Sequence, residues 1–277
     1  MHASMRVLHF ILGGALLAGS LGCHPARSAH SADPSVTPAG WRLVWADEFD
    51  RPGLPDPSRW TYEEGLVRNR EAQYYTRARR ENARVEDGML VIEARKEPHG
   101  QAQYTSASVT TEGRASWRYG RIEVRAKLPQ GRGMWPAIWT LGANHRQVGW
   151  PMTGEIDIME FVGFDPDTIH ANVHTAAFNH RDRTGRGAKL HVPRPFERFH
   201  VYAMEWTKER IDVSVDGATY FTFRNTGGGE REWPFDAAQY LILNVAVGGA
   251  WGGQRGIDDG IFPQRFFVDY VRVYQRK

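Results

Sequence analysis

Cysteine is almost absent from the sequence. The 277 residues include one cysteine, Cys23, so the chain forms no internal disulfide bond. Long amphipathic helical patterns are also lacking, which argues against an α/β fold. The sequence shows no internal repeat. No nucleic-acid-binding motif accompanies the basic stretch at residues 68–80, which carries much of the formal charge of +3. We therefore expect that stretch to be a solvated face, and we expect no nucleic-acid partner.

The first 22 residues have the features of an export signal. Arg6 precedes an apolar run, residues 7–22, that is too short and too glycine-rich for a membrane span. Cys23 follows directly, and the segment resembles a bacterial lipoprotein signal, in which the cysteine is lipidated and becomes the mature N-terminus. Ser20 departs from that pattern, and the alternative is a plain secretory signal cleaved near Cys23. We expect an exported protein, either anchored through Cys23 to the periplasmic or cell-surface face of a membrane or secreted.

The rest of the chain divides into a linker and one domain. Residues 23–40 are rich in Pro, Ser and Ala without apolar periodicity, which predicts a flexible linker. Residues 41–277 have the length of one large β-sandwich. The hydrophobic content of 41% is enough for a sizeable core, and 29 glycines suit a protein with many turns.

Strand patterns fill this domain. Residues 120–128 alternate between apolar and charged side chains, as in a half-buried strand, and residues 211–223 form a hairpin around Asp216-Gly217. Many short strands with short turns predict an all-β sandwich or barrel. If residues 266–274 pair with residues 42–49, the two ends of the domain meet. Further strands are predicted at residues 89–95, 169–175, 199–207 and 240–247.

The segment GEIDIMEFVG, residues 154–163, places three carboxylates among apolar residues that favour a strand. Strand alternation puts Glu155 and Asp157 on one face but turns Glu160 toward the core. In one interpretation the acids are solvated edge residues, or Glu160 caps a turn. In the other, a β-bulge at Ile158–Met159 adds one residue and returns Glu160 to the face of the other acids. Three acids together would raise at least one pKa, and their spacing suits the roughly 5–5.5 Å carboxyl separation of retaining glycosidases.

Tryptophans surround these acids in the sequence. Trp135 and Trp139 lie four residues apart, on one face of a strand, and could be core residues or a flat surface on which sugar rings stack. Trp251 stands in a glycine-rich loop, GGAWGG, where it has little core to join. An aromatic residue on such a loop favours a contact surface.

A second polar face lies at residues 169–175. His170, Asn172 and His174 alternate with apolar residues and form either a solvated face or the floor of a polar cleft. In the second case His174 could hydrogen-bond a catalytic carboxylate. Strand alternation alone does not converge three ligands on zinc, so we predict no metal site there.

Together these motifs resemble family-16 glycoside hydrolases, most closely the bacterial laminarinase (endo-β-1,3-glucanase) branch. The resemblance covers roughly residues 41–277. It implies a β-jelly roll of two curved antiparallel sheets with a substrate cleft along the concave face. The four motifs that carry it are GEIDIMEFVG, WPAIWTLG, NREAQYYT and the closing VDYVRVYQ.

The resemblance also implies roles for individual residues. Glu155 would be the nucleophile, Glu160 the general acid and later the base, and Asp157 would hydrogen-bond the nucleophile and tune how the proton is shared. No catalytic cofactor is implied. A structural calcium would be held by Glu48, the Gly88 carbonyl and Asp269, with oxygen ligands that suit this ion. The implied substrate-binding residues are Asn69, Arg114, Trp135, Trp139, Trp150, His174 (as a polar residue near the acid/base) and Trp251.

We therefore expect a retaining endo-β-1,3-glucanase that acts on a polysaccharide, as a monomer. A same-family enzyme with another substrate is the main alternative, for example a mixed-linkage glucanase, a galactanase or a transglycosylase. The arginine-rich stretch at residues 68–80 leaves an anionic galactan as a possible substrate. A non-catalytic glucan-binding protein is less favoured, because such relatives typically lose the acids and all three are present here.

Overall fold

The strand-rich pattern of the sequence is matched by the architecture. The computed structural model describes residues 1–2 and 37–277, and residues 38–277 form one compact unit. The predicted signal segment, Cys23 and most of the predicted linker lie outside the described residues. Among those described, no helix has the length and apolar character needed to cross a membrane.

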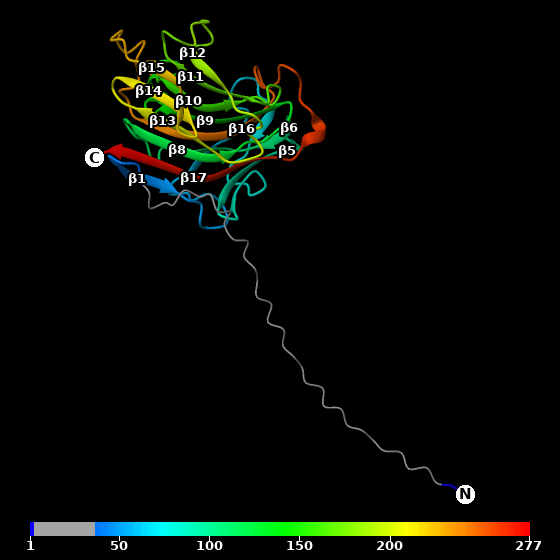
Figure 1. Cartoon of the computed structure of the whole chain (residues 1–277). Helices are drawn as coiled ribbons and strands as arrows, with labels where there is room; N and C mark the ends of the chain where they lie inside the picture. The colour runs from blue at the N-terminus through cyan, green and yellow to red at the C-terminus, as the bar shows by residue number, and fades with distance from the viewer. Residues whose placement is uncertain (3–36) are drawn as a thin grey trace. The chain divides into compact units, whose positions relative to one another are not determined.

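Two β-sheets make up the unit (Figure 1). The larger has the order β15-β14-β13-β8-β17-β5-β6-β3, with β1 also on β17 and β4 on β5. Its strands are β1 Trp41–Asp47, β3 Gln73–Tyr75, β4 Ala83–Glu86, β5 Met89–His99, β6 Ala102–Ser106, β8 Gly120–Lys127, β13 His200–Trp206, β14 Arg210–Val215, β15 Ala218–Arg224 and β17 Gln264–Arg276.

The smaller sheet carries the predicted site. Its order is β12-β11-β10-β9-β16-β7-β2, and every pairing within it is antiparallel. One short helix, α1 His145–Val148, follows β9, and a 3-10 turn, η1 Asp259–Ile261, precedes β17. The strands are β2 Thr61–Glu63, β7 Ser108–Thr110, β9 Met134–Gly142, β10 Glu155–Phe161, β11 Thr168–His174, β12 Arg186–His191 and β16 Gln239–Val247. The predicted all-β jelly-roll sandwich is confirmed.

The predicted pairing of the first and last strands is also confirmed. Trp41 lies opposite Arg276 and Asp47 opposite Val271, so β1 runs antiparallel to β17 (Figure 1). Residues that are far apart in the sequence are therefore neighbours in one sheet. This closure supports a single domain.

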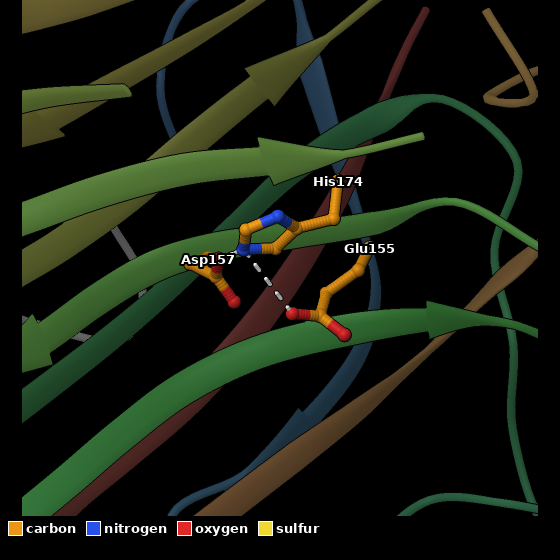
Figure 2. Close-up of side chains that lie close together, drawn as sticks. All are labelled: Glu155, Asp157 and His174. Atoms are coloured by element: carbon orange, nitrogen blue, oxygen red, sulfur yellow. Dashed lines mark ion pairs between the residues drawn. The ribbon is translucent and has the colours of Figure 1, made fainter. Parts of the chain in front are cut away.

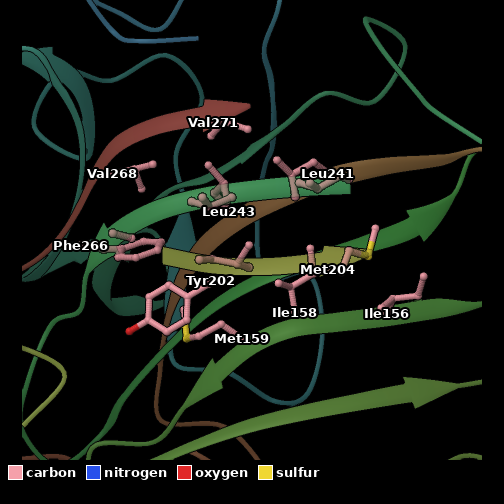
Figure 3. Packing of buried hydrophobic residues seen from close by; sticks show 14 of the residues in the cluster. Ile156, Ile158, Met159, Tyr202, Met204, Leu241, Leu243, Phe266, Val268 and Val271 are labelled. Atoms are coloured by element: carbon pink, nitrogen blue, oxygen red, sulfur yellow. The ribbon is translucent and has the colours of Figure 1, made fainter. Parts of the chain in front are cut away.

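The hydrophobic core lies between the two sheets. Ile158 from β10 and Leu243 from β16 meet Met204 from β13 and Val268 from β17, and all four are fully buried (Figure 3). Burying one such side chain contributes about 1.5–3 kcal/mol. The smaller sheet thus turns one face to the core and leaves the other free for polar groups.

Shortening Ile158 should destabilise the fold in proportion to the apolar volume removed. We expect Ile158→Ala to lower the free energy of unfolding by about 2–5 kcal/mol and Ile158→Val by about 0.5–1.5 kcal/mol. Urea unfolding followed by tryptophan fluorescence measures both. Equal effects for the two variants would contradict the packed position described here.

Candidate active site

A β-bulge in β10 sets the direction of the acids. Along β9, Asp157 lies opposite Trp139, but the next pair joins Met159 to Ile138, so Ile158 is an extra residue. The register with β11 shifts in the same place, between Asp157 and Glu160. The bulge predicted at Ile158–Met159 is therefore present.

The bulge places two consecutive side chains in the core. Ile158 and Met159 are both fully buried in the hydrophobic cluster, although regular alternation would send them to opposite faces (Figure 3). Alternation then restarts one residue later. Glu160 consequently shares the outer face with Glu155 and Asp157 and does not point into the core.

A cavity of 1220 Å³ opens on this outer face of the smaller sheet. Its floor is partly apolar, because Trp139, Leu141 and Tyr240 form a separate buried cluster there. The cavity brings together the three acids and six of the seven predicted substrate-binding residues. Those six are Asn69, Trp135, Trp139, Trp150, His174 and Trp251.

Hydrogen bonds hold each glutamate from a different direction. Trp150 Nε1 donates to Glu155 Oε2 at 2.9 Å. Glu160 receives two donors, because Trp135 Nε1 lies 3.1 Å from Oε1 and Asn172 Nδ2 lies 2.9 Å from Oε2. Two tryptophans predicted to bind sugar thus also orient the carboxylates.

His174 lies between the first two acids (Figure 2). Its Nε2 is 3.3 Å from Asp157 Oδ2 and 3.6 Å from Glu155 Oε1. The resemblance placed His174 beside the acid/base and joined Asp157 to Glu155 by a hydrogen bond. Instead, His174 links Asp157 and Glu155, and the group that bonds Glu160 from the same strand is Asn172. The ligand atoms of Glu155, Asp157 and His174 lie within 4.8 Å of one another, close enough to hold a metal ion.

Burial and mutual repulsion shift the ionisation of these groups. Burial, followed by the charge of Asp157, raises the pKa of Glu155 to about 7 and that of Glu160 to about 8. Burial alone would lower the pKa of His174, but Asp157 and the two glutamates outweigh it and raise that pKa to about 9. Both glutamates therefore keep their protons to higher pH than a solvated carboxyl group does.

The tryptophan rings that line the cavity differ in solvent exposure. Trp135 and Trp251 meet edge to face at 5.4 Å, and Trp251 also packs against His170. Trp139 is buried and donates to Asn244 at 2.8 Å, while the guanidinium of Arg68 covers its ring at 4.8 Å. Trp135 and Trp251 consequently offer a wall for sugar stacking, and Trp139 belongs to the floor.

Arg114 was predicted to lie in the cleft, and this prediction is wrong. Arg114 sits in a turn in which its backbone N–H donates to Thr111, and its side chain is exposed and lies outside the cavity. The same turn directs Glu112 into the cavity wall. Three other arginines line the cavity, Arg68, Arg146 and Arg181, and Arg68 is ion-paired with Glu63.

Sequence reasoning also missed a buried carboxylate beneath Asn69. Glu71 accepts hydrogen bonds from Asn69, Gln73 and Tyr75, and desolvation raises its pKa. All four residues lie in the NREAQYYT motif. Their spacing at every second position was visible in the sequence, but their mutual hydrogen bonds were not.

The three predicted calcium ligands meet on one edge of β17. Glu48 follows β1 and Gly88 precedes β5, and both of those strands pair with β17 on either side of Asp269. Oxygen donors from three segments fit calcium in kind. Both carboxylates already have cationic partners, however, since Arg272 donates twice to Glu48 and Arg125 donates to Asp269 at 2.7 Å.

Paired glutamates with raised pKa values, set in a cavity walled by tryptophan, are typical of a glycoside hydrolase. The chain belongs to glycosyl hydrolases family 16, whose sequence profile matches residues 70–272. Enzymes of this kind need no catalytic cofactor.

Individual relatives are similar over most of the chain. A beta-glucanase of Rhodothermus marinus is 52% identical over 269 residues, which cover 94% of this chain and 93% of the relative. The crystal structure of the laminarinase from Rhodothermus marinus superposes with a TM-score of 0.83 at 53% identity, covering 86% of this chain and 98% of that one. A non-specific endo-beta-1,3(4)-glucanase from the same family, SCLam, gives a TM-score of 0.82 at 48% identity, covering 88% and 95%.

The pH dependence of kcat/KM should be bell-shaped. Activity rises as Glu155 loses its proton and falls as Glu160 loses its own, and we expect both limbs above the ordinary glutamate value of 4.5. Asp157→Asn removes a negative charge that raises both pKa values, so both limbs should move to lower pH. A wild-type profile centred near pH 4.5, or an unmoved profile in the variant, would contradict the electrostatics described.

Proposed function

We propose that this protein is a retaining endo-β-1,3-glucanase that cleaves laminarin-like glucan by double displacement. The observation that carries the proposal is the bulge that brings Glu155, Asp157 and Glu160 to one face of a tryptophan-walled cavity. The family, together with relatives named as laminarinases and glucanases, supports the substrate class.

In the first step, the carboxylate of Glu155 attacks the anomeric carbon as the glycosidic C–O bond breaks. Glu160 gives its proton to the departing oxygen, and a covalent glycosyl-enzyme forms. The Trp150 indole and the protonated His174 beside Glu155 favour its ionised form. In the second step, ionised Glu160 takes a proton from water, whose oxygen attacks the anomeric carbon and releases Glu155. Two inversions give net retention.

A second substrate is favoured by one specific observation. SCLam, which is 48% identical, is described as a non-specific endo-beta-1,3(4)-glucanase. Mixed-linkage glucan is therefore the alternative that we rank next, ahead of a galactan or a transglycosylation acceptor. A purely glucan-binding role is disfavoured because the full set of acids is present and aligned.

Glu155→Gln should abolish hydrolysis without disturbing the fold. We expect kcat/KM on laminarin to fall by at least about a thousandfold, equivalent to about 4 kcal/mol of transition-state stabilisation. The matched control is Glu209→Gln on the exposed surface. Product sizing and proton NMR of the first anomer released give the cleavage mode and the stereochemistry. Full activity in the variant would exclude Glu155 as nucleophile, and cleavage of agarose but not laminarin would overturn the substrate.

We also propose the structural calcium at Glu48, Gly88 and Asp269. An ion there would add a further link between the first and last strands. Chelation should then lower the melting temperature, and added calcium should restore it. Because Arg272 and Arg125 already neutralise the two carboxylates, an unchanged melting temperature would mean that these arginines alone hold the segments together.

Export and anchoring through Cys23 are proposed from the sequence pattern alone. Wild-type protein expressed in a bacterial host should be recovered with membranes, and Cys23→Ser should be released into the soluble exported fraction. Equal distribution of the two proteins would leave only the secretory alternative.

A further inference from the structure

Gly187 lies directly across from Asn172 where β12 pairs with β11. β12 is the edge strand of the smaller sheet. Asn172 is the residue whose Nδ2 donates to Glu160 Oε2 at 2.9 Å. Asn172 therefore lies between Gly187 and Glu160, the predicted acid/base.

The surroundings of Gly187 leave no space for a side chain. A Cβ at this position would lie 2.9 Å from Asn172 Cγ, closer still to Asn172 Oδ1, and 2.5 Å from the carbonyl oxygen of Ala171. Gly187 does not adopt a positive φ, so its backbone conformation alone does not require glycine. What the position requires is space that the Asn172 carboxamide and the Ala171 carbonyl oxygen fill.

We infer that Gly187 is a positioning residue whose missing side chain lets the Asn172 carboxamide lie flat against β12 and donate to Glu160. The inference rests on the proposed role of Glu160 as acid/base. Asn172 and Trp135 hold the two oxygens of Glu160 from opposite neighbouring strands, and this fixes the plane of the carboxyl group. A fixed plane presents the proton to the glycosidic oxygen in each cycle.

Several charged or titratable groups face Glu160 from the elements around it. Asp157 and Glu155 on β10 raise its pKa, and His174 on β11 lowers it. The hydrogen bond from Asn172 favours the ionised carboxylate, so its loss should raise the pKa of Glu160 further. Further titratable or charged groups on these neighbouring elements are His170 on β11, Arg186, Lys189 and His191 on β12, and Tyr220 and Arg224 on β15.

Gly187→Ala should therefore impair protonation of the leaving group by Glu160 and leave nucleophilic attack by Glu155 unchanged. We expect kcat/KM for phenyl β-laminaribioside to fall by about tenfold to a hundredfold, the range for a lost hydrogen bond to a charged group. For 2,4-dinitrophenyl β-laminaribioside, whose leaving group needs little protonation, we expect a change of less than about twofold. The alkaline limb of the pH profile should move to higher pH.

The matched control is Gly185→Ala, because a Cβ there meets nothing within 4 Å and the position does not adopt a positive φ. It should behave as wild type on both substrates. Asn172→Ala should reproduce the selective loss on the phenyl glycoside seen for Gly187→Ala, and the double variant should lose little more on that substrate, since the inferred effect of Gly187 on Glu160 passes through Asn172.

Three results would overturn the inference. They are equal losses on the two aryl glycosides, additive losses in the double variant, and wild-type behaviour of Asn172→Ala. If Gly187→Ala does not fold, because its Cβ also meets the Ala171 carbonyl oxygen, Asn172→Ala alone decides the matter, and equal losses of that variant on the two aryl glycosides would overturn the inference. A wild-type protein inactive on laminarin and on both aryl glycosides would instead contradict the proposed function.

Discussion

One extra residue in β10 determines where the carboxyl group of Glu160 lies. Without it, strand alternation would bury that group in the core, where an unpaired charge is costly. With it, Ile158 and Met159 both enter the core and the third acid joins the first two. The sandwich supports this arrangement from behind, because β13 and β17 of the opposite sheet pack against the bulged segment.

The electrostatics of the site follow from this crowding. Three carboxylates on one strand repel one another, and burial removes the water that would screen them. The histidine between Glu155 and Asp157 offsets part of the repulsion on the nucleophile side. Among the described residues, the hydrogen-bond donors to Glu160 are the neutral side chains of Trp135 and Asn172, and burial together with the charge of Asp157 raises its pKa.

Much of the fold could be predicted from the sequence, because the alternation of apolar and polar residues marks the strands. The strands follow from where alternation holds, whereas the bulge was one of two interpretations of the acid segment and the β1–β17 pairing was a conditional expectation, and the structure contains both. Arg114 could not be placed, since a turn closed by Thr111 decides its direction. The Asn172–Glu160 bond was equally hidden: alternation gives the face on which Asn172 lies, but its partner depends on strand register and on the space left by Gly187.

The bulge also changes which kinds of sequence variation the site can tolerate. Between Glu155 and Glu160 the count of residues matters more than their identity, because any apolar pair at Ile158–Met159 keeps both acids on the outer face. Losing or gaining a single residue there would invert the face of one acid while leaving the composition of the segment almost unchanged. Among diverging copies of such a chain, a change of length in β10 would thus separate active from inactive forms more sharply than most substitutions in the core.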